Sequence, residues 1–140
     1  MTIGDVARLA DATTIVRLTL HVLAASVWVG GQFVMAGLVP AVRGLGEGAA
    51  QKVARAFGRL SWPAFAVLIA TGVWNVAAVA HHTTGAWNVA FGVKMGTVVL
   101  AGAGAALHQR AATPRARGVY AGVAALASTA ALVLGVALAG

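Results

Sequence analysis

Four long apolar stretches, joined by short polar segments, constrain the fold of this chain more than any other feature of its sequence. They cover roughly residues 14–39, 62–80, 91–107 and 119–139, and about 20 apolar residues are enough for a helix to cross a bilayer. Only 9% of the residues are charged, whereas a soluble domain has about 25%. The sequence therefore predicts an all-α integral membrane protein, in which residues 1–140 form a single four-helix bundle in the lipid bilayer.

The positive charge of the chain, +7 in total, is gathered in two of the three connections. Those two connections hold Arg43, Lys52, Arg55, Arg59, Arg110, Arg115 and Arg117. The remaining connection, HHTTGAWN, has no Lys or Arg. Basic loops stay on the cytoplasmic side, so we expect both termini outside and a bacterial-type cytoplasmic (inner) membrane. Anionic lipid beside these loops accounts for the charge, and we expect no nucleic-acid partner.

Tryptophan and proline positions predict where the spans begin and end. Trp62 is expected at the start of the second span, and Trp87 in the connection on the outer side, because tryptophan favours the membrane surface. Pro63 is expected in the first turn of the second span, where a missing N–H costs nothing. Pro40 is expected to mark the inner end of the first span.

Polar and small residues recur at helical spacing within three of the four stretches. They are Arg17, His21, Ala24, Trp28, Gly31, Gln32 and Met35 in the first stretch, Thr71, Asn75 and His82 in the second, and Lys94, Thr97, Ala101, Gly104 and His108 in the third. Residues three and four apart share one helix face, and lipid offers polar groups no partners. We therefore expect these faces to meet inside the bundle, with close helix contacts at Gly30, Gly31, Gly92 and Gly96.

Depth in the membrane decides which of these groups can share a ligand. At 1.5 Å per residue, His21 and His108 are about 16 Å apart in depth, whereas two nitrogens on one metal are about 4 Å apart. The sequence predicts that these histidines do not share a metal. At the depth of His21 are Lys94, Met95 and Thr97, and His108 is level with Gln32 and Met35. His81 and His82 are interpreted as solvated loop residues.

The two cations of the polar face point to an anionic ligand. Arg17 and Lys94 lie near the same end of their spans, and none of the four stretches contains Asp or Glu. A b-type haem would satisfy the whole set, with iron on His21 and its propionates beside Arg17 and Lys94, and with Trp28 as a further cofactor contact. Copper is the alternative, with His21 and Met95 as candidate ligands at one level and His108 and Met35 as candidate ligands of a separate site, since copper accepts imidazole and thioether.

Two segments resemble a known family. HVLAASVWVGG, residues 21–31, resembles the histidine, tryptophan and glycine helix of the copper-resistance D (CopD) membrane proteins. RAFGRLSWPAFAVLIATGVWN and FGVKMGTVVLAGAGAALHQR resemble that family's next two helices, with the TG pair at Thr71 and Gly72 and the lysine at Lys94. The histidine-to-tryptophan spacing and this lysine are also similar to HemJ-type protoporphyrinogen oxidases, membrane proteins thought to bind haem b. In place of the tyrosine- and arginine-rich run of those oxidases, this chain has QFVMAGLVPAVR.

The resemblance implies copper homeostasis or haem-linked membrane redox, with His21 as the family histidine and Lys94 as the family lysine. We expect a small CopD-like protein that holds a b-type haem or a copper ion at His21, with Met95 as the second axial ligand. One alternative is a non-catalytic subunit of a larger respiratory or transport complex, or a homo-oligomer. A second alternative is a HemJ-like protoporphyrinogen oxidase.

Overall fold

The computed structural model describes residues 9–80 and 84–139, and over these ranges the chain is helical apart from short turns. Its elements are α1 (Ala12–Ala25), the π-helical segment η1 (Ser26–Gly30), α2 (Gly31–Arg43), α3 (Ala49–Val79), α4 (Gly85–Arg110) and α5 (Pro114–Ala139). Because α1, η1 and α2 are continuous, they form one long helix. That helix and the other three are each long and apolar enough to cross a membrane, which confirms the predicted all-α class with four apolar helices.

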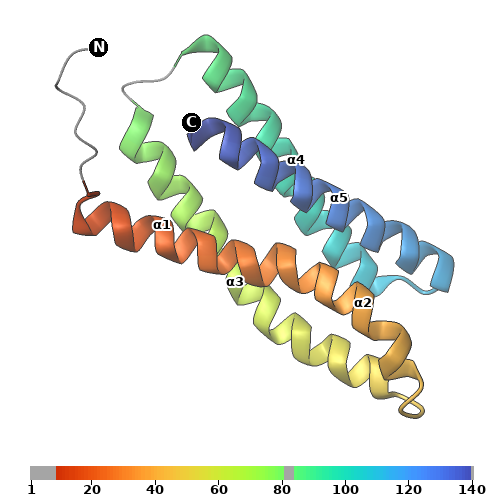
Figure 1. Cartoon of the computed structure of the whole chain (residues 1–140). Helices are drawn as coiled ribbons and strands as arrows, with labels where there is room; N and C mark the ends of the chain where they lie inside the picture. The colour runs from red at the N-terminus through yellow and green to blue at the C-terminus, as the bar shows by residue number, and fades with distance from the viewer. Residues whose placement is uncertain (1–8, 81–83, 140) are drawn as a thin grey trace.

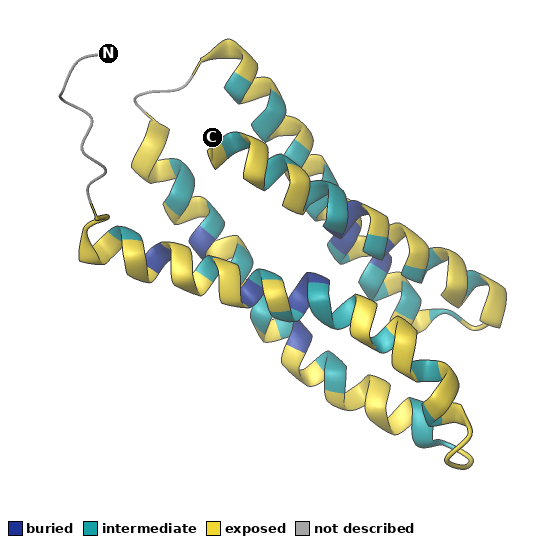
Figure 2. Ribbon diagram, in the orientation of Figure 1, coloured by how far each residue is buried: buried dark blue, intermediate teal, exposed yellow. Residues whose placement is uncertain are grey.

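The helices are arranged as two pairs (Figure 1). The long helix α1–η1–α2 crosses α3, and α4 lies beside α5 along most of its length. The turns at residues 44–48 and 111–113 lie toward one end of the molecule, which we call the basic end, and the start of α1 and the ends of α3 and α5 lie toward the other. Buried residues are concentrated where the helices cross, and exposed residues cover the outer surface (Figure 2). Lipid is the solvent that such an apolar outer surface requires.

Short polar residues explain where the helices begin. Asp11 caps α1 by accepting hydrogen bonds from the Thr14 hydroxyl at 2.8 Å and the Thr14 backbone N–H at 3.0 Å. These hydrogen bonds, that of the hydroxyl first, lower the pKa of the Asp11 carboxyl. Thr113 caps α5 by accepting from the Ala116 N–H at 3.1 Å, and Pro114 occupies the first helical position, where its missing N–H costs nothing.

The basic connection between the first two predicted spans is mostly helix. Gly48 has a left-handed backbone with φ of 78°, and α3 begins at the next residue. The prediction that Lys52, Arg55 and Arg59 lie in a loop is therefore wrong. Hydropathy marks the part of a helix that lies in lipid, not its ends. At 1.5 Å per residue α3 is about 46 Å long, so it extends beyond a hydrocarbon core of about 30 Å.

Three further boundary predictions are corrected for the same reason. Pro63 lies inside α3 and not in its first turn. Pro40 lies inside α2, which continues to Arg43. Trp87 is in the first turn of α4 rather than in the connection, and its backbone N–H donates to the capping hydroxyl of Thr84 at 3.2 Å. Each helix thus continues further than its apolar stretch.

The backbones of α4 and α5 approach each other closely at Gly104. A Cβ at this position would lie 2.9 Å from the backbone nitrogen of Ala124 and 3.2 Å from the Tyr120 carbonyl oxygen. Backbone atoms cannot move aside as a side chain can, so only glycine permits this approach. Small residues at such contacts are typical of membrane helices, which associate through close packing.

The glycines that the sequence suggested for close contacts are mostly elsewhere. A Cβ on Gly30, Gly92 or Gly96 would meet no atom within 4 Å, so the prediction of close contacts there is wrong. Gly31 does face a neighbour, because a Cβ there would lie 2.7 Å from Cζ of Phe57. The helices therefore pack against each other through faces that do not carry Gly30, Gly92 or Gly96.

Candidate functional site

One face of the long helix α1–η1–α2 is turned toward the other helices, as its spacing predicts. Arg17, Ala24 and Trp28 are 9%, 6% and 4% exposed, and His21 between them is partly buried. Their neighbours Leu18, Val22 and Leu23 are exposed. A helix that carries one arginine and one histidine on its inward face needs partners for both groups.

His21 finds its partner in Thr71 of α3. The His21 Nδ1 lies 2.7 Å from the Thr71 hydroxyl oxygen, which in turn lies 2.7 Å from the Val67 carbonyl oxygen. A carbonyl oxygen only accepts, so the hydroxyl donates to Val67, and the His21 Nδ1–H donates to the hydroxyl. A neutral imidazole that carries its proton on Nδ1 has a free lone pair on Nε2. The neutral His21 ring therefore presents Nε2 as a ligand atom.

Arg17 and Asn75 form a second contact one turn along the same two helices. The Arg17 Nη1 donates to the Asn75 backbone carbonyl oxygen at 3.5 Å. The side-chain oxygen of Asn75 is buried and has no hydrogen-bond partner among the described residues. A buried guanidinium that, among the described residues, makes a single long hydrogen bond to a neutral carbonyl keeps donors available for an anion.

Lys94 reaches the level of His21 from the other helix pair. Trp28 donates its indole N–H to the Ser128 hydroxyl at 3.0 Å, and α1 and α5 run in opposite directions (Figure 1). His21 lies seven residues from Trp28, and Gly135 lies seven residues from Ser128, in both cases away from the basic end. Seven residues are about two helical turns, so His21 and Gly135 lie at the same level. A Cβ on Gly135 would lie 3.1 Å from the Lys94 Nζ, so the Lys94 ammonium lies at about the level of His21.

Polar groups of α1, α3 and α4, together with Gly135 of α5, thus lie at about one level of the bundle, and we call them the histidine cluster. It consists of Arg17 and His21 from α1, Thr71 and Asn75 from α3, and Lys94 from α4, where Gly135 of α5 leaves room for the lysine. Its chemistry is one free imidazole nitrogen and two cations within apolar surroundings. Such a set can bind a group that combines a metal with negative charge.

Trp28 has a packing environment of its own, closer to the basic end than His21. Its ring centroid lies 4.3 Å from that of Phe65 and 5.5 Å from that of Trp62. Gln32 donates to the Trp28 carbonyl oxygen at 3.0 Å and to the Ser128 hydroxyl at 3.1 Å. These contacts join the long helix to α3 and α5, and the contact of Trp28 with a cofactor stays a prediction.

The other candidate ligands lie apart from His21. Met95 is 37% exposed and follows Lys94 on α4, so its side chain leaves the helix about 100° away from that of the lysine. Met35 lines an apolar groove with Phe57. At 1.5 Å per residue, Met35 lies about 21 Å along its helix from His21. Ligation by Met95 or Met35 therefore stays a prediction, without a structural contact to His21 to support it.

His108 serves the turn between α4 and α5. Its Nδ1–H donates to the Arg117 carbonyl oxygen at 2.8 Å, and the Arg117 guanidinium donates to the Ala111 carbonyl oxygen at 3.1 Å. Over residues 9–80 and 84–139, no three His, Cys, Asp or Glu residues come together as a metal site. His81 and His82 lie outside the described residues.

The sequence alone does not show that Thr71, Asn75 and Ser128 are hydrogen-bond partners of residues in the long helix. Thr71 and Asn75 stand on a polar face of their helix, but periodicity does not say which residue of another helix lies opposite. Ser128 is 2% exposed in a stretch that otherwise reads as generic. A hydroxyl in an apolar span is the signal that marks such a residue, because it needs a hydrogen-bond partner there.

Comparison with known proteins gives no matching family model, no similar curated protein and no similar solved structure. The function is therefore inferred from the residues of the histidine cluster and their contacts.

Proposed function

We propose that this chain is a small membrane redox protein that holds a b-type haem through His21, in the manner of the CopD-like and HemJ-type proteins that its sequence resembles. The observation that carries the proposal is the hydrogen bond from the His21 Nδ1–H to Thr71, whose own proton is directed to Val67. Metal-bound histidines characteristically donate their other ring N–H to an oxygen acceptor, which fixes the tautomer and the ring orientation.

The residues of the cluster suit haem better than a bare copper ion. A porphyrin supplies four nitrogens, so an axial imidazole is what the protein has to add. A copper ion without a porphyrin takes most of its ligands from protein side chains, and in the described part of the chain no three His, Cys, Asp or Glu residues come together. The two cations also fit, since haem propionates are carboxylates and Arg17 and Lys94 belong to the same cluster.

Each residue then has a defined task. Bound haem would supply one-electron redox chemistry, and the protein supplies its ligation and surroundings. His21 holds the iron, and Thr71 keeps the ring in position. Arg17 and Lys94 neutralise the propionates, which would otherwise be costly to place in lipid. The lipid-covered helices around the cluster keep water away from it.

The test compares two histidine variants of the full chain purified in mild detergent. We expect His21→Ala to abolish the Soret band, because the axial ligand is lost. The matched control is His108→Ala, which removes the same side chain from the α4–α5 turn and should leave the haem content unchanged. Full haem content in His21→Ala would remove His21 from the proposal. Bound copper without a Soret band in the unsubstituted protein would favour the copper alternative.

A further inference from the structure

The helices α3 and α4 lie side by side toward the basic end, with two contacts that set their register. A Cβ on Gly102 would lie 3.0 Å from Cζ of Phe65, and a Cβ on Gly58 would lie 3.6 Å from Nε2 of Gln109. The two contact residues of α3 are seven positions apart, and those of α4 are also seven positions apart but in the reverse order along the chain. The helices are therefore antiparallel neighbours from Phe65 to the basic end.

This register places arginines of both helices on one side of the pair. Arg59 follows the contact residue Gly58, and Arg110 follows the contact residue Gln109. The next residue along a helix points 100° away from the one before it. Because the two helices are antiparallel, the residue that follows each contact residue points to the same side of the pair. Arg55 lies on the same side of α3, one turn from Arg59. All three arginines are exposed.

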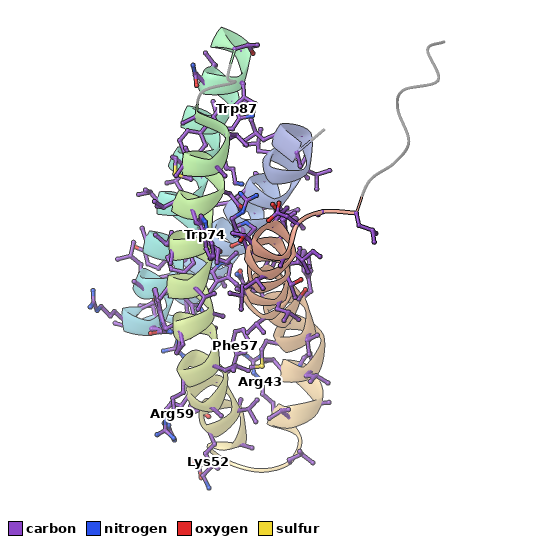
Figure 3. All side chains as sticks on the ribbon, turned by 90° about the vertical axis from the view of Figure 1, so that its left-hand side faces the viewer. Arg43, Lys52, Phe57, Arg59, Trp74 and Trp87 are labelled. Carbon is purple, nitrogen blue, oxygen red and sulfur yellow. The ribbon has the colours of Figure 1, made fainter. Side chains whose placement is uncertain are left out.

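Lys52 completes this set, which we call the α3–α4 basic cluster: Lys52, Arg55, Arg59 and Arg110. Figure 3 shows Arg59 pointing away from α2, and Arg43 on the other side of α3. The acids among the described residues are Asp11, which lies at the opposite end, and Glu47 in the turn before α3. The cluster therefore gathers four positive charges where two helices leave the apolar region.

The apolar surface beside the cluster indicates what kind of anion it receives. Leu107, one turn before Arg110 on α4, is 45% exposed. Cations at the end of two spans, followed by an exposed leucine toward the bilayer, match a phosphate that is linked to acyl chains. Basic pockets between transmembrane helices bind the headgroups of anionic lipids in this way.

We propose that the α3–α4 basic cluster binds the headgroup phosphate of an anionic phospholipid, whose acyl chains extend along α4 past Leu107. Arginine suits this ligand because its planar guanidinium donates two parallel hydrogen bonds to phosphate oxygens. The proposal is independent of the haem, since the cluster lies at the basic end and the histidine cluster lies deeper along α1 and α3.

The test measures lipid retention by the full chain in mild detergent, using native mass spectrometry with phosphatidylglycerol and phosphatidylcholine as probes. We expect the unsubstituted protein to retain phosphatidylglycerol preferentially. Arg59→Gln and Arg110→Gln should each lower its affinity by roughly fivefold, the effect of one basic side chain near a lipid surface. The matched control is Arg43→Gln, which removes the same charge at the same end and should leave the preference unchanged.

Three outcomes would overturn the proposal. Equal retention of the two lipids shows that no anionic headgroup is selected. An equal loss in Arg43→Gln and Arg59→Gln shows only the general attraction of a basic protein end. Unchanged affinity in Arg59→Gln and Arg110→Gln excludes the cluster itself. Helical content by circular dichroism confirms that each variant is folded, and the haem content of the same samples separates this result from the proposed function.

Discussion

At the scale of single residues, the tautomer of His21 depends on which atom accepts the hydroxyl proton of Thr71. The Thr71 hydroxyl has one proton to donate, and the Val67 carbonyl oxygen at 2.7 Å receives it. The oxygen of Thr71 then accepts from His21, and Nε2 of His21 is left as the ligand atom. In the proposed site Thr71 is thus a positioning residue, which would act on haem only through the histidine.

Replacing Thr71 separates positioning from ligation. Thr71→Val keeps the shape of the side chain but removes the acceptor, so His21 loses its fixed orientation. We expect haem affinity to fall by roughly 10- to 100-fold, as for other residues that support a metal ligand. The midpoint potential of the remaining haem should shift as well. Thr71→Ser retains the hydroxyl and should restore both values.

The two measurements are haem dissociation and redox titration of purified protein. If Thr71→Val shows the haem affinity and the potential of the unsubstituted protein, the hydrogen bond has no influence on the iron ligand. Helical content measured in parallel shows whether either variant has simply lost its fold.

The chemistry of single residues predicts the charged members of the cluster better than their partners. Arg17, His21 and Lys94 stand out in the sequence because ionisable groups are rare within spans. Thr71 and Asn75 do not stand out in this way, because hydroxyl and amide groups are common on helix faces. Their pairing with His21 and Arg17 depends on the register between α1 and α3, and no periodicity within one helix contains that register.

At the scale of the helices, hydropathy predicts the four spans but not where each helix ends. The segment from Ala49 to Arg59 is polar enough to be read as a loop, but it continues α3 beyond the bilayer. The π-helical segment at Ser26–Gly30 is also beyond prediction, because its residues suit an ordinary α-helix. The Ser26 hydroxyl donates to the Val22 carbonyl oxygen at 2.9 Å there, and such side-chain bonds to the preceding turn often bend helices.

We expect the packing of α4 against α5 to be disrupted by the substitution of one glycine of α4 and to be unaffected by the substitution of another. In Gly104→Leu the new side chain would collide with the backbone of Ala124, so the helices must separate. We expect stability to fall by about 1–3 kcal/mol, the usual cost of overpacking. A Cβ at Gly96 on the same helix would meet no atom within 4 Å, so Gly96→Leu should be close to neutral.

Thermal unfolding followed by circular dichroism in one detergent compares these two variants directly. Equal midpoints for Gly104→Leu and Gly96→Leu would mean that the close approach at Gly104 does not hold α4 to α5.

At the scale of the whole molecule, both basic turns lie toward one end and the start of α1 lies toward the other (Figure 1). This arrangement is what a protein needs if its basic end faces the cytoplasm. The orientation itself remains a prediction from the distribution of Lys and Arg. The chain has no cysteine, so single introduced cysteines can report each end separately.

Labelling of two single-cysteine variants tests the orientation. Leu9→Cys lies at the end away from the basic turns, where Leu9 is 97% exposed, and Glu47→Cys lies in the turn before α3. We expect a membrane-impermeant maleimide to label Leu9→Cys in intact cells, and Glu47→Cys only after the membrane is opened. The reverse pattern would place the basic end outside.

The central claim, that His21 holds a b-type haem in this helix arrangement, is tested most directly by the absorption spectrum of the unsubstituted protein. The protein is purified in mild detergent from haem-replete cells, and iron, copper and haem are measured in the same sample. The account predicts a Soret band, reducible haem b and about one iron per chain, because the described part of the chain offers one such imidazole, that of His21. A colourless protein without iron, after a purification known to retain haem in other membrane proteins, would contradict it.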